Sequence, residues 1–278
     1  MEELIDGLLA DDDSVEIFAA PPKAAAVPET KAAVPEAATL VPPVLIGIRG
    51  DMGAGKDTLA AEICREYPAF RTAKFAAKLR AAAALIADIP VERTESAEDK
   101  AVDISAPRSA RDMFARVQQA IELVTGEPAD RCIAAQMFAT LTGFAAARPD
   151  ETAVIPLTVG GLLQVLGTEC FRTLVGPNVW VNVLFAGWDA GGRPPTVIAD
   201  TRFPNESAAI RARGGVVVLV RRRDAARADG RAAGHASERA LDGEAPDLVL
   251  DNDGSVADLM AAFRAAVPGL RAAAAARA

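Results

Sequence analysis

The sequence predicts an α/β fold in which a parallel sheet has helices on both faces. Short apolar runs, such as 44–48 and 214–220, alternate with stretches of helical periodicity, as expected when each strand is buried between helices. One stretch, about 100–190, carries helical patterns without strands and is too long for an ordinary crossover. We therefore expect a helical insertion at one edge of the sheet, walling the cleft at the carboxyl ends of the strands.

The individual elements follow from the same alternation of patterns. A polar connection is expected at 91–108, ahead of the main helices of the insertion. Strands are expected at 44–48, 71–76, 195–200, 214–220 and 247–250. Helices are expected at about 56–67, 77–88, 107–124, 130–147, 159–174, 178–188, 205–213 and 255–267.

Residues 1–42 differ in composition from the rest of the chain. They hold nine acids and two lysines, a net charge of −7 out of the −8 of the whole chain, and 19–42 are rich in alanine and proline. We predict a disordered acidic tail with a semi-rigid linker, one domain at 43–270 and a frayed tail at 271–278. A second interpretation of the acidic tail stays open, in which the apolar side chains of 1–18 dock on a protein partner.

Composition excludes several classes of protein. The chain has no apolar run of about 18 residues, so no membrane association is expected, and its acidic N-terminus lacks the positive region of a signal peptide. Three scattered cysteines support neither a disulfide framework nor a zinc site, and the single His235 excludes a multi-histidine metal site. The nearly neutral body does not indicate binding to a nucleic-acid polymer. We expect a cytoplasmic protein.

The stretch 46–60, IGIRGDMGAGKDTLA, carries the strongest functional motif. Gly50 through Lys56 match the phosphate-binding pattern G-x-x-x-x-G-K-[ST], except that Asp57 stands where Ser or Thr is expected. Backbone N–H groups of such a loop surround phosphate oxygens, the next helix adds its positive N-terminal end, and Lys56 reaches the β and γ phosphates. Asp57 would hold Mg²⁺ through a carboxylate oxygen, leaving Thr58 for the α-phosphate. The predicted nucleotide-binding residues are Gly50, Gly53, Ala54, Gly55, Lys56, Asp57, Thr58 and, from a later turn, Asn252. The alternative is an ordinary glycine turn.

Two further stretches place charge at the ends of predicted strands. Asp200 would hold Mg²⁺ or its water, and Arg202 would clamp an acceptor phosphate with two parallel hydrogen bonds. The arginine-rich segment 221–239 suits a lid over a transferring phosphoryl group, where Arg221 and Arg222 would stabilise charge. The alternatives are an incidental salt bridge at the first stretch and a solvated charged loop at the second.

A helix in the insertion is the candidate acceptor-binding surface. Pairs among four polar residues lie four or five positions apart, so that most of the four share one helix face, where they could read a base edge and a phosphate. They are Gln164, Thr168, Glu169 and Arg172. Trp180 is expected to pack in the core rather than to stack on a base. The turn at 252–254 either lies over the donor's purine or simply precedes the cap of the last helix.

With these residues in view, the chain resembles the deoxynucleoside monophosphate kinases of tailed bacteriophages, which are P-loop nucleoside monophosphate kinases. The resemblance spans about residues 44–260. It rests on GDMGAGKDTLA, FAAKLR, LLQVLGTECFR…PNVWVN, VIADTRFPNESAAIRARGGVVVLVRR, HASE and NDGSVADL. The G-K-D-T form of the loop is typical of that family, which makes Asp57 a variant of a working phosphate loop. The chain departs from the family at Ala77 and Lys78, and at 158–161, where Arg108 could replace an arginine that the family often carries.

The resemblance implies phosphoryl transfer from ATP, with Mg²⁺, to a deoxynucleoside 5′-monophosphate, in the host cytoplasm if the chain is phage-encoded. It implies a P-loop kinase core within 43–270, a helical acceptor-binding insertion at about 100–190 and a lid at 221–239. The catalytic residues would be Lys56, Asp200, Arg202, Arg221 and Arg222, and the metal ligands Asp57 and Asp200. The acceptor would be held by Arg80, Gln164, Thr168, Glu169, Arg172 and Arg202.

The sequence is also compatible with two other functions. The first is a P-loop kinase for another small phosphorylated acceptor, similar to dephospho-coenzyme A. The second is a catalytically weak ATP-binding adaptor that recruits a partner through its acidic tail. A homodimer is also compatible with the sequence.

Overall fold

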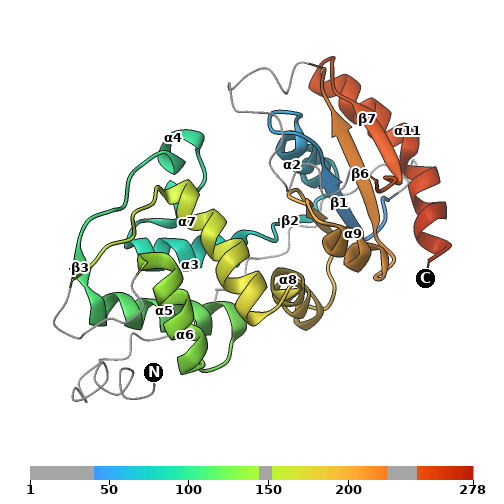
Figure 1. Cartoon of the computed structure of the whole chain (residues 1–278). Coiled ribbons are helices and arrows are strands. Elements are labelled where there is room, and N and C mark those ends of the chain that lie inside the picture. The colour runs from blue at the N-terminus through green and yellow to red at the C-terminus, as the bar shows by residue number, and fades with distance from the viewer. Residues whose placement is uncertain (1–40, 144–151, 224–242, 278) are drawn as a thin grey trace, which may run out of the picture.

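The computed structural model describes residues 41–143, 152–223 and 243–277, and the other residues lie outside this description. Its centre is a five-stranded parallel sheet in the order β2-β5-β1-β6-β7 (Figure 1). The strands are β1 (Leu45–Arg49), β2 (Arg71–Ala73), β5 (Thr196–Ile198), β6 (Val216–Arg221) and β7 (Leu248–Asp251). The predicted α/β class with a parallel sheet is therefore confirmed.

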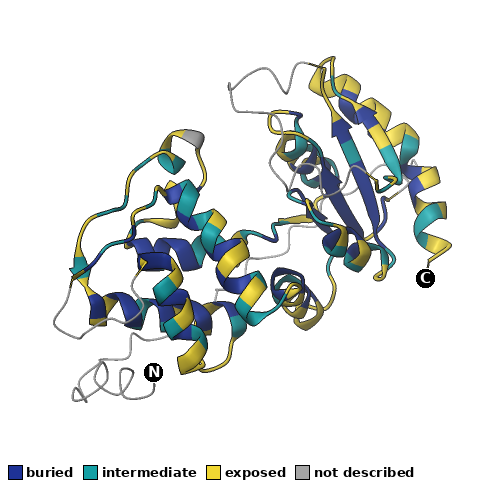
Figure 2. Ribbon diagram, viewed as in Figure 1, coloured by how far each residue is buried: buried dark blue, intermediate teal, exposed yellow. Residues whose placement is uncertain are grey.

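The central strand β1 is buried on both faces because its side chains alternate between two apolar cores. Ile46 and Ile48 point into the core formed with α2 (Lys56–Glu66) and α11 (Val256–Ala275). Leu45 belongs to the second core, which extends into the helical insertion. The sheet is accordingly dark blue throughout its centre in Figure 2, and it holds the strand ends rigidly.

The opposite face of the sheet is covered by α9 (Pro204–Arg211). Ile210 of α9 packs so close to β1 that a Cβ added at Gly47 would lie 2.5 Å from its Cδ1 atom, and no larger residue fits there without repacking. The sheet thus has helices on both faces, and this leaves the carboxyl edge for the loops that follow the strands.

A helical lobe at 77–190 lies beside the sheet (Figure 1), and it begins before the insertion expected at about 100–190. Its helices pack around aromatic side chains, among them the edge-on pair Phe114 and Phe138 with ring centroids 6.0 Å apart. Its elements are α3 (Ala77–Ala87), η1 (Val91–Thr94), α4 (Ala97–Lys100), β3 (Arg108–Ser109), α5 (Ala110–Thr125), α6 (Arg131–Thr142), β4 (Thr152–Ala153), α7 (Val159–Val165), η2 (Leu166–Val175) and α8 (Val179–Ala190). In the described part of the chain, no helix is long and apolar enough to cross a membrane.

Two expectations about this lobe differ from the structure. The polar connection at 91–108 contains η1, α4 and part of a small antiparallel ladder between β3 and β4. The helix expected at 159–174 changes character at Leu166, where it becomes a ten-residue π-helix, η2. A π-helix has one more residue per hydrogen-bonded ring than an α-helix, so side chains five apart come into line rather than side chains four apart.

The C-terminus also differs from the expectation of a frayed tail at 271–278. Helix α11 continues to Ala275, with Leu270 buried against the sheet. Arg277 then pairs with Asp247, at the start of β7, and donates to the carbonyl of Gly215 at 3.3 Å. These contacts hold the last turn of the helix in place, whereas the alanine-rich composition alone suggested fraying.

Candidate functional site

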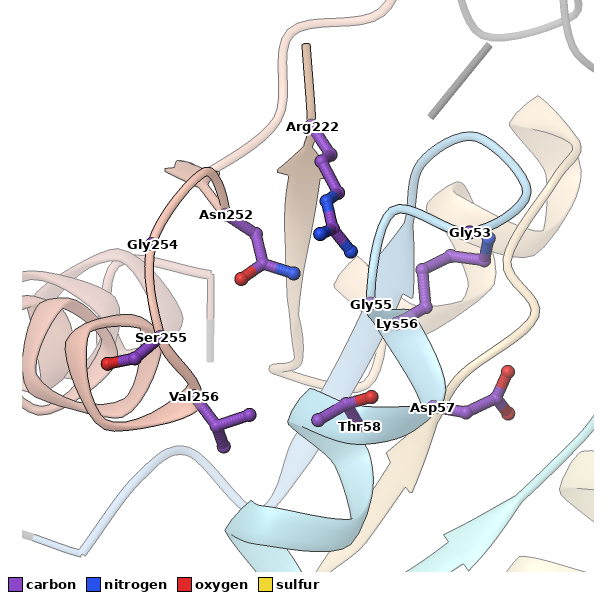
Figure 3. Close-up of a pocket in the computed structure, with 10 residues that line it drawn as sticks. All are labelled: Gly53, Gly55, Lys56, Asp57, Thr58, Arg222, Asn252, Gly254, Ser255 and Val256. Carbon is purple, nitrogen blue, oxygen red and sulfur yellow. The ribbon is translucent and has the colours of Figure 1, made fainter. Parts of the chain in front are cut away.

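The carboxyl ends of the parallel strands meet at one edge of the sheet, and the residues after them build the candidate site. The loop after β1 leads into α2, the turn after β7 leads into α11, and Arg222 follows β6. Together they enclose a cavity of about 440 Å³. Its lining consists of Gly53, Gly55, Lys56, Asp57, Thr58, Arg222, Asn252, Gly254, Ser255 and Val256, which are drawn in Figure 3.

The loop at 50–55 has a shape that requires glycine. Gly50 has φ 144°, and a Cβ there would lie 2.1 Å from the carbonyl oxygen of Val220 on β6. Gly55 has φ 99°, and a Cβ there would lie 2.2 Å from the amide nitrogen of Asn252. Both positions therefore combine a left-handed backbone with a close neighbour, and the loop is pressed against β6 and β7.

Lys56 begins α2 and lies over this loop. Its Nζ donates to the carbonyl of Asp51 at 2.6 Å, so the ammonium folds back along the loop towards Gly53 (Figure 3). The first N–H groups of an α-helix have no partner within the helix, and they point towards the space above its N-terminus. A cavity bounded by this helix start, glycine N–H groups and a lysine favours phosphate oxygens.

Arg222 differs from the two arginines beside it. Arg221 pairs with Asp251 at 3.0 Å, and Arg223 pairs with Asp253 at 2.9 Å, so both bind acids at the end of β7. Arg222 instead points towards the loop between Asn252 and Gly55 (Figure 3). The alternation of side chains along an extended chain explains why only the middle arginine of the three reaches the cavity. The rest of the predicted lid, including His235, lies outside the described residues.

Asn252, in the turn after β7, contacts the glycine loop at 50–55. Its side-chain amide donates to the carbonyl of Ala54 at 2.8 Å and thereby joins the turn after β7 to the phosphate-binding motif. Ser255 caps α11, where its hydroxyl accepts from the N–H of Asp258, so the expected cap is present. The next residue, Val256, adds an apolar side chain to the cavity wall.

Asp57 and Thr58 place oxygen atoms at the rim of the cavity. The Asp57 carboxylate is 73% exposed and lies 3.0 Å from Nζ of Lys74, which follows β2. Hard oxygens suit Mg²⁺, which binds through few protein ligands when a nucleotide supplies phosphates. The described residues contain no group of three or more His, Cys, Asp or Glu that would hold a metal by themselves. The donors present therefore fit a magnesium ion that arrives with a nucleotide.

Asp200 is held away from the cavity lining by the backbone of the β2–α3 connection. Its two carboxylate oxygens accept the N–H groups of Phe75 at 2.8 Å and of Ala76 at 3.0 Å. Burial raises the pKa of Asp200, although these hydrogen bonds and the nearby charges of Arg202 and Lys74 act in the opposite direction. Asp200 thus joins the end of β5 to the start of the insertion.

Arg172 and Arg202 were both predicted to hold the acceptor, but the structure gives them different surroundings. Arg172 is 16% exposed, pairs with Glu206 at 3.0 Å and lies over the ring of Phe203, 4.0 Å from its centroid. Arg202 is exposed at the turn between β5 and α9. Its backbone N–H donates to Glu206 at 2.7 Å, so the same carboxylate holds both arginines.

Neither Glu206 nor Lys74 belongs to a motif that predicts a role for it in the site. Glu206 stands at the third position of α9, where a glutamate commonly accepts the N–H groups that precede the helix, and that signal could have pointed to it. Burial raises its pKa, while the backbone N–H of Arg202 and the charge of Arg172 oppose this change. The pairing of Lys74 with Asp57 has no comparable local signal.

The remaining predicted acceptor residues lie in the helical lobe. Arg80, on α3, is 18% exposed and pairs with Glu95 at 3.0 Å. The side chains of Gln164, Thr168 and Glu169 are exposed along α7 and η2, outside the lining of the cavity as the described residues define it. Trp180 is 3% exposed and donates to the carbonyl of Gly167 at 3.1 Å, as expected of a core residue.

Arg108 does not stand beside the acceptor candidates of α7 and η2. Its guanidinium donates to the carbonyl of Ala87 at 2.6 Å and lies 3.7 Å from Asp88. Arg116 binds the same Asp88 at 3.1 Å. Both arginines therefore bind the C-terminal end of α3, which favours positive charge.

Comparison with known proteins places the chain in a family. The family model described as deoxynucleotide monophosphate kinase matches residues 111–263, which is more than half of the chain. The matched region runs from α5 into α11 and includes Glu206, Arg222 and Asn252, whereas the glycine loop precedes it. A comparison with curated proteins finds no match.

Proposed function

The chain belongs to the deoxynucleotide monophosphate kinase family, and from this premise we propose that it transfers the γ-phosphoryl group of ATP to a deoxynucleoside 5′-monophosphate. The family match agrees with the resemblance found in the sequence and identifies a kinase that uses small nucleotides. The observation that most supports ATP as the donor is the cavity at the N-terminus of α2, which Lys56 and Arg222 border. The products would be ADP and the deoxynucleoside diphosphate.

In this proposal the phosphate-binding loop holds the donor. Backbone N–H groups of 50–56 and the start of α2 bind the β and γ phosphates, and Lys56 leaves the Asp51 carbonyl to reach the γ-phosphate. Thr58 bonds the α-phosphate. Asn252 holds the loop through Ala54, and Val256 offers an apolar surface at the far side of the cavity.

A magnesium ion would neutralise phosphate charge and orient the γ-phosphoryl group. Asp57 supplies a carboxylate oxygen at the cavity rim, and Asp200 is the second acid in the proposed ligand set. Asp200 already accepts two backbone N–H groups, so we assign it to the water shell of the ion rather than to direct contact.

The acceptor would bind on the side of the helical lobe. Arg202 is exposed beside Asp200 and would hold the acceptor phosphate, together with Arg80. Gln164, Thr168 and Glu169 would read the base. We assign Arg172 to this site indirectly, because its ion pair with Glu206 supports the turn that carries Arg202.

Catalysis then rests on position and on charge. An acceptor phosphate oxygen is already a nucleophile, so no general base is strictly needed. Lys56 and Arg222, from opposite sides of the cavity, would stabilise the charge that develops on the transferring group. Arg221 contributes less in this arrangement, because Asp251 pairs with it.

The first test is ADP formation from ATP and Mg²⁺ with each of the four common deoxynucleoside monophosphates. We expect turnover that requires an acceptor and that falls in a Lys56→Ala variant but not in Lys78→Ala, whose ammonium binds the carbonyl of Leu123 on α5. Turnover with dephospho-coenzyme A instead would identify another acceptor. Binding of ATP without acceptor-stimulated turnover would favour the adaptor and contradict the proposal.

A further inference from the structure

Lys74 follows β2 and lies near two acids, Asp57 on α2 and Asp200 after β5. Its Nζ is 3.0 Å from Oδ1 of Asp57, at the start of α2. The next two residues, Phe75 and Ala76, donate their backbone N–H groups to Asp200 at 2.8 and 3.0 Å. Three consecutive residues therefore bind both acids that the proposed function assigns to magnesium, one acid through a side chain and the other through the backbone.

The pair of Lys74 and Asp57 is open to solvent and to ions. The side chain of Lys74 is 34% exposed, and Asp57, which is 73% exposed, also lines the cavity. A magnesium ion on the Asp57 carboxylate would place a divalent positive charge within a few ångströms of the lysine ammonium. Like charges at that separation repel, so the metal and the ammonium compete for the same carboxylate.

We propose that Lys74 is a positioning residue that holds Asp57 in the metal-free protein and competes with magnesium for it. The proposal deepens the proposed function and rests on its assignment of Asp57 to the metal. The ion pair would orient the exposed Asp57 carboxylate beside the phosphate-binding loop. It also makes the affinity for magnesium depend on a residue of β2 that is not itself a metal ligand.

The test is the magnesium dependence of nucleotide binding by the full chain. A fluorescent, non-hydrolysable ATP analogue is titrated at a series of Mg²⁺ concentrations, all well above that of the analogue. The analogue binds Mg²⁺ equally in solution whichever variant is present. A difference in the magnesium midpoint between two variants therefore comes from the protein. For Lys74→Gln we expect the magnesium midpoint to fall by about two- to fivefold, the scale of losing an exposed ion pair.

Two controls decide between competition and a general effect of charge. Lys78→Gln removes the same charge four residues further on, from a lysine that donates to the Leu123 carbonyl at 3.1 Å, and should leave the midpoint unchanged. Lys74→Arg retains both the charge and a donor and should stay near the wild-type midpoint. An unchanged midpoint in Lys74→Gln would overturn the proposal.

A double-mutant cycle with Asp57→Asn makes the test specific to this pair. Without the Asp57 carboxylate, Lys74→Gln should no longer shift the midpoint. An equal shift with and without Asp57 would overturn the proposal, because the lysine would then act through its charge alone. Wild-type protein that binds the analogue with no magnesium dependence would contradict the assignment of Asp57 to the metal, and with it this proposal. Failure to bind the analogue at all would contradict the proposed function itself.

Discussion

Arg172 of η2 and Glu206 of α9, which are 34 residues apart in the chain, form a partly buried ion pair. The guanidinium of Arg172 also donates to the carbonyl of Pro177 at 3.2 Å. The second oxygen of Glu206 accepts the N–H groups of Arg202 and Phe203 at 2.7 and 3.1 Å. One carboxylate therefore fixes the turn that carries a proposed phosphate ligand.

This relationship predicts opposite phenotypes for two arginines that look alike in the sequence. Arg172→Met should lower the free energy of unfolding by about 3–5 kcal/mol, because it removes the cation that pairs with the buried Glu206 carboxylate. Arg202→Ala should change stability little, since its side chain is exposed, but should raise the KM for the acceptor by about tenfold or more. Urea unfolding and steady-state kinetics on both variants check this. A stable Arg172→Met variant with a raised acceptor KM would instead make Arg172 a direct ligand.

A second comparison concerns the arginines after β6. Arg222→Ala should lower kcat/KM for ATP by about 10- to 100-fold, the scale of a charge-assisted hydrogen bond to phosphate. Arg221→Ala, which removes only the partner of exposed Asp251, should lower it much less. Kinetics at saturating acceptor measure the difference. Equal losses in the two variants would show that the orientation of the side chains does not decide their roles.

The glycines of the loop allow a prediction about stability. In Gly50→Ala, an alanine would have φ 144° and a Cβ only 2.1 Å from the Val220 carbonyl oxygen. We expect this variant either not to fold or to lose about 4 kcal/mol or more of its free energy of unfolding. Gly53→Ala has φ 76°, but its Cβ would meet none of the described heavy atoms within 4 Å, so the cost should be about 1 kcal/mol. Thermal unfolding of both variants tests the contrast, and similar melting temperatures would contradict it.

Asp247 predicts a dependence of stability on pH. Burial alone would raise its pKa, but hydrogen bonds from Arg277 and the N–H of Val217, with the charge of Arg211, bring the pKa below its ordinary value. Because the pKa of Asp247 is lower in the folded protein, the unfolded chain binds the proton more readily. Ionised Asp247 therefore stabilises the fold above about pH 4, and this contribution is lost as the pH falls through the pKa of the folded state. Asp247→Asn should be less stable by about 1–3 kcal/mol at pH 7.

The difference in unfolding free energy between wild type and Asp247→Asn, measured by urea unfolding from about pH 7 to pH 2, checks this prediction. The difference should shrink towards the acid end of the series, as the wild-type carboxylate becomes protonated. A difference that stays constant across the series would show that Asp247 acts without its charge.

The sequence predicted the parallel sheet and the start of α2 well, because both depend on local patterns. Apolar runs mark β1, β5, β6 and β7, and the spacing from Gly50 to Lys56 marks the start of α2, whereas β2 has no apolar run. The role of Arg172 could not be predicted in the same way, since its partner Glu206 is distant in the chain. The π-helix η2 was missed because apolar spacing cannot show where one extra residue enters each turn.

Arg221 and Arg222 show a further limit of sequence patterns. Their composition indicates positive charge near phosphates, yet only the exact end of β6 decides which side chain faces the cavity. A shift of one residue in that strand would exchange their surroundings. Lys74 is similar, because its partner Asp57 is brought near by the packing of β2 beside the sheet and not by any motif.

The most direct measurement of the central claim follows a labelled γ-phosphoryl group from ATP, with Mg²⁺ and a deoxynucleoside 5′-monophosphate, in wild type and Lys56→Ala. We expect the label to appear in the deoxynucleoside diphosphate with the wild type, and Lys56→Ala to be slower by about 10²–10⁴-fold. Label released only as free phosphate, or equal transfer by both proteins, would contradict it.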